Sequence, residues 1–155
     1  MRDRIAFRLT VFAALLLSLI LPLTPHAVGG RPAPAPVAPR SAEAEYNKGL
    51  QSKAANRFPD AVNDFRRAVD IRPNFAEAWN ELGFALRNTG QYADALRAYE
   101  QALRLRPNYP EALEYMGEAY VKLGRLDEAR AILERLKPLD VARAQDLEAA
   151  IRAGR

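Results

Sequence analysis

The feature that most constrains the fold is a repeat of 34 residues in the second part of the chain. Glycines, alanines and large apolar residues all keep this step, in the sets Gly49, Gly83 and Gly117, Ala61, Ala95 and Ala129, and Phe65, Tyr99 and Leu133. A period shared by so many independent positions predicts that one supersecondary unit is copied three times. Each copy buries its apolar face against its neighbour.

Each unit is predicted to contain two helices, because Ala, Leu, Arg and Glu dominate the chain after residue 41. Pro73 and Pro107 end helices, since proline lacks a backbone donor and restricts the preceding residue. Asn56, Gly90 and Gly124 tolerate the left-handed conformation of the turn inside each unit. We therefore expect helices at 42–54, 59–71, 75–88, 92–105, 109–122 and 126–136.

The start of the first helix in the second and third units carries a capping signal. Asn74 is followed three residues later by Glu77, and Asn108 is followed by Glu111 in the same way. This spacing predicts a capping box, in which the two side chains satisfy each other's free backbone amides.

The crossing between the two helices of a unit is predicted to be close. Gly83 and Ala95 present little bulk there, so the helix axes can approach each other. Trp79 falls on the apolar helical face beside them, together with Leu82 and Tyr99. We expect Trp79 to belong to the core rather than to form a ligand platform.

The array is predicted to end with a capping helix, because Pro138 interrupts the third unit early. Asp140 is expected to cap a helix that runs to about residue 153 and closes at Gly154. Its apolar residues should cover the third unit while its charged residues face water, as an end repeat requires. The covering residues are Leu139, Val141, Leu147 and Ile151, and the outward ones are Arg143, Asp146, Glu148 and Arg152.

The motif Trp79-Asn-Glu-Leu82-Gly83, with Ala95, Tyr99, Ala102 and Pro107, resembles the tetratricopeptide repeat family. The first unit has Ser52 where an aromatic residue is usual, and the third departs at Leu136 and Pro138. The resemblance implies an all-α fold, a right-handed helical-repeat solenoid of three helix pairs plus a C-terminal capping helix. The units would be residues 42–75, 76–109 and 110–143, with the capping helix at 140–153.

The resemblance also implies that the first helix of each unit lines a concave groove for another protein or peptide. The groove positions are Glu43, Tyr46, Leu50, Lys53, Glu77, Asn80, Phe84, Arg87, Glu111, Glu114, Glu118 and Val121. Tyr46, Leu50 and Phe84 would form an apolar floor, although Tyr46 and Phe84 could equally belong to the core. The glutamates would give the third unit an acidic wall, suited to a partner bearing Lys or Arg.

A subclass of the family binds acidic C-terminal tails with a clamp of Lys, Asn and Arg. The matching positions here hold Tyr46, Leu50, Glu81, Glu111 and Tyr115. The clamp is therefore absent from this sequence, and binding of chaperone tails is not expected.

The first part of the chain reads as a targeting segment, residues 1–29, followed by a proline-rich linker, residues 30–41. Basic residues precede the apolar stretch 9–23, and small residues follow it, which is typical of a secretory signal peptide. Cleavage could follow Ala27 or Gly29, and the second is favoured. The alternative is an uncleaved anchor, although fifteen helical residues span about 22 Å against about 30 Å of hydrocarbon. Both interpretations place the repeats outside the cytoplasm.

Composition argues against catalysis and cofactor binding. The chain has no cysteine and a single histidine, His26, and it lacks nucleophile, phosphate-loop and calcium-loop motifs. Its 23 basic and 19 acidic residues are interspersed, so no nucleic-acid footprint is indicated. The sequence thus predicts an exported, periplasmic or secreted, non-enzymatic scaffold that binds a protein or peptide. The alternative is a membrane-tethered structural subunit of a secretion, pilus or respiratory-maturation assembly.

Overall fold

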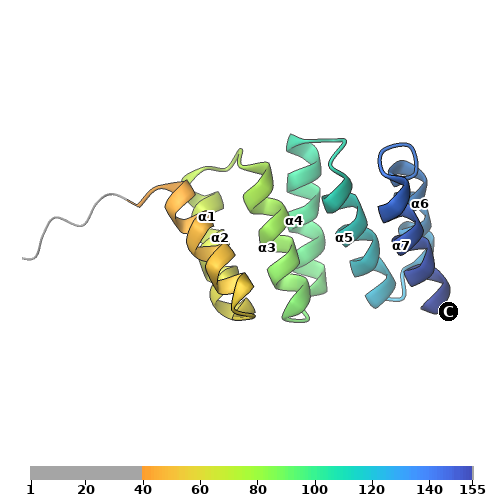
Figure 1. Ribbon diagram of the computed structural model, residues 1–155, viewed down its shortest axis with the longest axis horizontal. Helices are drawn as coiled ribbons and strands as arrows, with labels where there is room; N and C mark the ends of the chain where they lie inside the picture. The colour runs from red at the N-terminus through yellow and green to blue at the C-terminus, as the bar shows by residue number, and fades with distance from the viewer. Residues whose placement is uncertain (1–39, 155) are drawn as a thin grey trace, which may run out of the picture. The chain divides into compact units, whose positions relative to one another are not determined.

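A computed structural model describes residues 40–154, which form seven α-helices with no strand among them (Figure 1). The predicted helix ranges agree with the observed ones to within one residue at each end. The predicted signal peptide or anchor and the proline-rich linker up to residue 39 lie outside the described residues. The helices are α1 Ala42–Ala54, α2 Phe58–Ile71, α3 Ala76–Asn88, α4 Tyr92–Leu105, α5 Pro110–Lys122, α6 Leu126–Leu136 and α7 Val141–Ala153.

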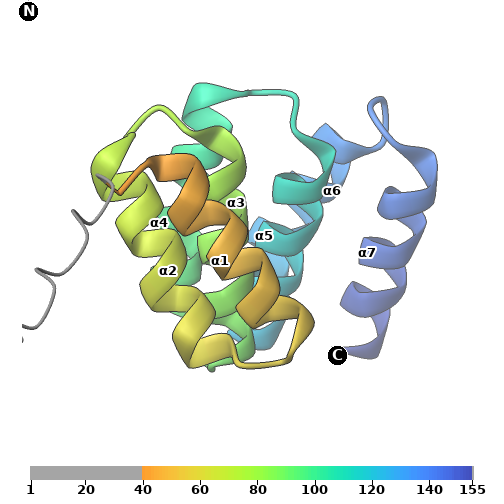
Figure 2. The same ribbon diagram turned by 60° about the vertical axis from the view of Figure 1, so that its left-hand side comes forward.

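The helices stack as antiparallel pairs in chain order, which is an all-α helical-repeat solenoid. In Figure 1, α1, α3, α5 and α7 form the front layer, and α2, α4 and α6 lie behind them. Figure 2 shows the same succession from the side, with α1 and α2 nearest the viewer. Within residues 40–154, no helix is both long enough and apolar enough to cross a membrane.

The turns inside the three units have the predicted backbone conformation. Asn56, Gly90 and Gly124 have φ angles of 56°, 78° and 71°, in the left-handed region. This conformation reverses the chain between the two helices of a unit and frees the last helical carbonyls for turn hydrogen bonds.

The predicted capping boxes are wrong. The helices α3 and α5 begin after Phe75 and Tyr109, and neither has a side-chain cap. Asn74 and Asn108 therefore lie one residue before the capping position, where their oxygens are out of register with the free amides. Glu77 is instead drawn into an ion pair with Arg106.

The close crossing of the two helices in a unit is confirmed. A β-carbon built on Gly83 would lie 2.5 Å from Cε1 of Tyr99, and one on Gly49 would lie 2.5 Å from Cε1 of Phe65. Both rings are fully buried. The glycines are therefore needed because the aromatic ring of the second helix rests on the backbone of the first.

Trp79 belongs to the core only in part. Its ring packs against the buried cluster but remains half-exposed. Its Nε1–H donates to the carbonyl of Pro73 at 2.8 Å, which ties the indole to the preceding turn. The polar end of the side chain is thus satisfied without water, and the ring edge stays accessible.

The predicted capping helix is confirmed as α7, and the side chain of Asp140 accepts from the amide of Arg143 at 3.1 Å. Leu147 and Ile151 are buried as expected. Leu139 and Val141 are exposed, so that part of the prediction is wrong. Coverage of the third unit starts only one turn into α7, and the residues that provide it follow helical spacing at Ala144, Leu147 and Ile151.

Candidate functional site

The face formed by α1, α3 and α5 carries a cluster of aromatic rings. Phe84 of α3 lies between Phe58 and Tyr115, with ring centroids 6.2 Å and 5.3 Å away. Tyr115 in turn lies 6.3 Å from the buried ring of Tyr99. We call the surface around Phe84, with Tyr46, Lys53, Glu81, Arg87, Tyr115 and Glu118, the inner face.

Tyr46 belongs partly to the core and partly to the surface, the two alternatives that its sequence position left open. Its ring packs against Phe65 at 5.7 Å and Phe75 at 4.8 Å, yet it stays partly exposed. Burial raises the pKa of Tyr46, and the carboxylates of Glu81 and Glu77 raise it further. The hydroxyl of Tyr46 therefore stays neutral beside these carboxylates, while its ring belongs partly to the core and partly to the inner face.

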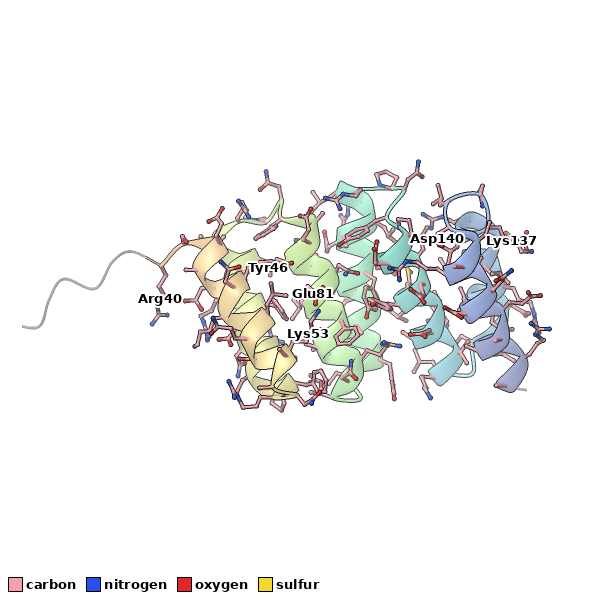
Figure 3. All side chains as sticks on the ribbon, in the orientation of Figure 1. Arg40, Tyr46, Lys53, Glu81, Lys137 and Asp140 are labelled. Atoms are coloured by element: carbon pink, nitrogen blue, oxygen red, sulfur yellow. The ribbon has the colours of Figure 1, made fainter. Side chains whose placement is uncertain are left out.

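Ion pairs connect the successive front helices across the inner face. The Nζ of Lys53 on α1 lies 2.5 Å from Oε2 of Glu81 on α3, and Figure 3 shows the two side chains pointing toward each other. Arg87 on α3 pairs in the same way with Glu118 on α5. Each pair joins one unit to the next, so the charges of the inner face are balanced locally.

The cations of these ion pairs also cover the aromatic rings. Nζ of Lys53 lies 5.1 Å from the centroid of Phe84, and the guanidinium of Arg87 lies 5.4 Å from Phe84 and 5.1 Å from Tyr115. Cation–π contacts of this kind add attraction where the cation is partly desolvated. The result is an apolar patch framed by positive groups that already have carboxylate partners.

The expected acidic wall of the third unit is corrected by the structure. Glu111 and Glu114 both pair with Arg143 of α7, which turns inward rather than facing water as predicted. Glu114 is only 7% exposed, and its burial raises the pKa of its carboxyl against the effect of Arg143. With Glu118 held by Arg87, the third unit offers no unpaired carboxylate among these positions.

The predicted groove residues do not all reach the inner face. Lys53, Phe84, Arg87 and Glu118 come together there, whereas Asn80 is 2% exposed and belongs to the helix packing. Glu77 pairs with Arg106 beyond α4, and Leu50 is half-buried against the core. Glu43 pairs with Arg72 in the first unit.

Two residues of the inner face, Glu81 and Tyr115, are missing from the predicted stripe, and so is Phe58, whose ring packs against Phe84. Glu81 and Tyr115 lie one position beyond the predicted stripe residues Asn80 and Glu114, and Phe58 comes from the start of α2. One residue turns a helix by about 100°, so a stripe displaced by one position changes which side chain reaches the surface. The family's clamp positions, which include Glu81 and Tyr115, are the sequence signal that could have found these two residues.

The inner face contains aromatic, aliphatic and paired charged groups, and such groups suit contact rather than chemistry. No group of three or more potential metal ligands occurs among residues 40–154. The arrangement of helix pairs and this face define a helical-repeat interaction fold.

Comparison with known families gives the class a name. A family model described as Tetratricopeptide repeat matches residues 86–151, and one described as TPR repeat matches residues 49–90. Together the two matches cover all six repeat helices in whole or in part and most of α7. The chain belongs to the tetratricopeptide repeat family, as its motifs predicted.

Solved structures share the fold at low sequence identity. The first TPR of Spaghetti (RPAP3) bound to HSP90 peptide SRMEEVD has a TM-score of 0.67 at 21% identity, covering 73% of this chain and 92% of that one. The TPR2B domain of yeast Sti1 in its complex with pHsp70 has a TM-score of 0.70 at 17% identity, covering 74% and 98%. The Arabidopsis OM64 TPR domain has a TM-score of 0.69 at 20% identity, covering 73% and 95%. A search of curated protein sequences found no match.

Proposed function

We propose that the chain is a non-catalytic scaffold that binds a peptide segment of another protein on its inner face. The observation that carries the proposal is the half-buried aromatic patch at Phe84 and Tyr115, which spans two units. Partly exposed aromatic anchors inside a polar rim are typical of the centre of protein interfaces. The pairing of Lys53 and Arg87 with carboxylates supplies such a rim.

The structural neighbours support the class of ligand but not its identity. The first TPR of Spaghetti is seen with an HSP90 peptide, and the second TPR domain of human RPAP3 with HSP70 peptide SGPTIEEVD. In the present chain, the positions of the family's carboxylate clamp hold Tyr46, Leu50, Glu81, Glu111 and Tyr115. The bound segment should therefore be recognised through apolar side chains and should not need an acidic terminus.

The proposal is tested by site-specific photocrosslinking in the native cell. We expect p-benzoylphenylalanine in place of Tyr115 to capture a defined partner, and the same group in place of Glu148 on α7 to give none. The partner peptide is then synthesised, and its affinity is measured by calorimetry with the parent chain and with Phe84→Ala. Loss of a central aromatic anchor should weaken binding by about 2 kcal/mol, or roughly thirtyfold.

The same experiment can also contradict the proposal that the inner face binds the partner. Equal capture at Tyr115 and Glu148, or unchanged affinity of Phe84→Ala with unchanged helicity, would remove the inner face as the binding surface. Phe84 is preferred to Tyr46 for this test because Tyr46 packs against the core ring of Phe65, and its removal would also alter stability.

We further propose that the scaffold works outside the cytoplasm, in the periplasm or after secretion. The basic, apolar and small-residue order of residues 1–29 supports this, with an uncleaved anchor of a larger envelope assembly as the second candidate. Mass spectrometry of the chain isolated from its cell distinguishes the two. A mature N-terminus near residue 30 supports export and cleavage, whereas an intact chain in the membrane fraction supports the anchored subunit.

A further inference from the structure

A crevice lies between α2 and α4, away from the inner face. It has a volume of about 410 Å³, and α3 forms its floor. Trp79, Leu82 and Leu86 contribute apolar surface to the floor, while Arg66, Asp94 and Arg97 form a polar rim. We call it the outer crevice. It is an open depression of the surface rather than an enclosed cavity.

The apolar residues of the crevice differ from those at the next junction. Leu86 recurs one repeat later as Tyr120, whose larger ring is 8% exposed and carries the guanidinium of Arg125 at 4.7 Å. Leu86 itself is buried in the core, whereas Trp79 is half-exposed and recurs one repeat later as the smaller Leu113. The indole of Trp79 is therefore the main apolar surface that this junction offers to a ligand.

The rim of the crevice has an unbalanced positive charge. Arg97 forms an ion pair with Asp94, but Arg66 forms no ion pair with any residue in the part of the chain that the structure describes. At the next junction the equivalent residues are Glu100 and Ala131, so both cations are specific to this one. A planar guanidinium beside an apolar floor favours a ligand that brings a carboxylate, which it can bind through two parallel hydrogen bonds.

We propose that the outer crevice is a second docking site, for a protein segment with a bulky aliphatic side chain next to a carboxylate. The aliphatic group packs on the half-exposed ring of Trp79, above the buried side chains of Leu82 and Leu86. The carboxylate accepts hydrogen bonds from the guanidinium of Arg66. The Nε1–H of Trp79 is already donated to Pro73, so the indole contributes contact area and no polar recognition. This site is separate from the inner face and does not depend on its proposed function.

The site can be observed directly, because Trp79 is the only tryptophan of the chain. Its indole N–H gives a single resonance in the ¹⁵N-labelled full-length protein. The probe is a capped peptide with Leu-Asp at its centre and Gly-Ser on both sides, and the comparison is the same peptide with Leu-Asn. We expect a saturable shift of the indole resonance with Leu-Asp, at an affinity about tenfold higher than with Leu-Asn.

Two variants and two controls locate the binding. Leu86→Tyr introduces the residue of the next repeat into the crevice and should abolish the shift. Arg66→Glu changes only an exposed side chain, keeps the fold and should remove the preference for Leu-Asp. Arg104→Glu changes another exposed arginine, at the end of α4, and Phe84→Ala alters the inner face. Neither control should change the response.

The outcomes separate clearly. A response to Leu-Asp that is lost in Leu86→Tyr and weakened in Arg66→Glu, with both controls unchanged, supports the outer crevice. Equal responses to the two peptides, no response to either, or a preference for Leu-Asp that persists in Arg66→Glu would overturn the proposal. A response that disappears only in Phe84→Ala would assign the peptide to the inner face instead.

Discussion

Replacing Gly83 by alanine tests the central packing argument, that the helices of a unit cross with an aromatic ring resting on a glycine backbone. In this position the new β-carbon would lie 2.5, 2.7 and 2.8 Å from Cε1, Cδ1 and Cζ of Tyr99. These distances are far inside normal van der Waals contact. Tyr99 is fully buried, so its ring has no solvent space into which it can turn.

The expected magnitude is the difference between two opposing effects. Alanine in place of glycine favours a helix by about 0.5–1 kcal/mol. Overpacking of a filled core costs about 1–3 kcal/mol, and contact with three atoms of a rigid ring belongs at the upper end. We expect Gly83→Ala to lower the free energy of unfolding by about 2 kcal/mol, and the midpoint of thermal unfolding by at least about 5 °C.

Gly117→Ala is the matched control, because its β-carbon would meet a flexible side chain instead of a ring. The nearest atoms are Cδ2 and Cδ1 of Leu147, at 2.5 and 2.7 Å, and these are the ends of an aliphatic side chain on α7. The loss should therefore be smaller than for Gly83→Ala. Urea unfolding followed by circular dichroism measures both changes. Stabilisation by Gly83→Ala, or a larger loss for Gly117→Ala, would refute the reasoning.

Three further perturbations follow from local contacts. Gly90→Ala forces a residue with φ of 78° to carry a side chain, so urea unfolding should show a loss of about 1 kcal/mol although no atom lies within 4 Å of the new carbon. Arg143→Ala leaves the buried Glu114 without its cation, and thermal unfolding at pH 7 should show a loss of about 1–2 kcal/mol that shrinks as Glu114 becomes protonated. Burial raises the pKa of Glu77, but the hydrogen bond from Arg106 outweighs burial and holds that pKa below its ordinary value of 4.5. The ion pair between Glu77 and Arg106 therefore stabilises the fold above pH 4.5, and this contribution is lost as pH falls through the lowered pKa. Glu77→Gln should show a smaller loss of stability on acidification in the same assay.

Local rules were sufficient for the helices and their order. The 34-residue period, the prolines and the left-handed turn residues placed each helix boundary within one residue. The capping boxes failed because a difference of one residue in the start of α3 and α5 moves Asn74 and Asn108 out of register. Spacing along the chain defines a helix well, but capping depends on backbone geometry at a single residue.

The residues of the inner face were predicted only in part, and the pairing of its charged residues was not predicted. The sequence identified Lys53, Phe84 and Arg87, because repeat position determines the approximate helical face. It could not show that Glu111, Glu114 and Glu118 each pair with an arginine of a neighbouring helix, since those pairs join residues about thirty positions apart.

The sequence alone therefore determined the repeat, the helix pairs and the family, because these depend on periodicity and on short-range backbone preferences. Only the tertiary structure decided that Arg143 turns inward, that Leu147 rests on Gly117 and that Trp79 lines a crevice between α2 and α4. Each of these depends on how neighbouring units pack against one another. Such packing is set by side-chain volumes and charges on different helices, which no single repeat contains.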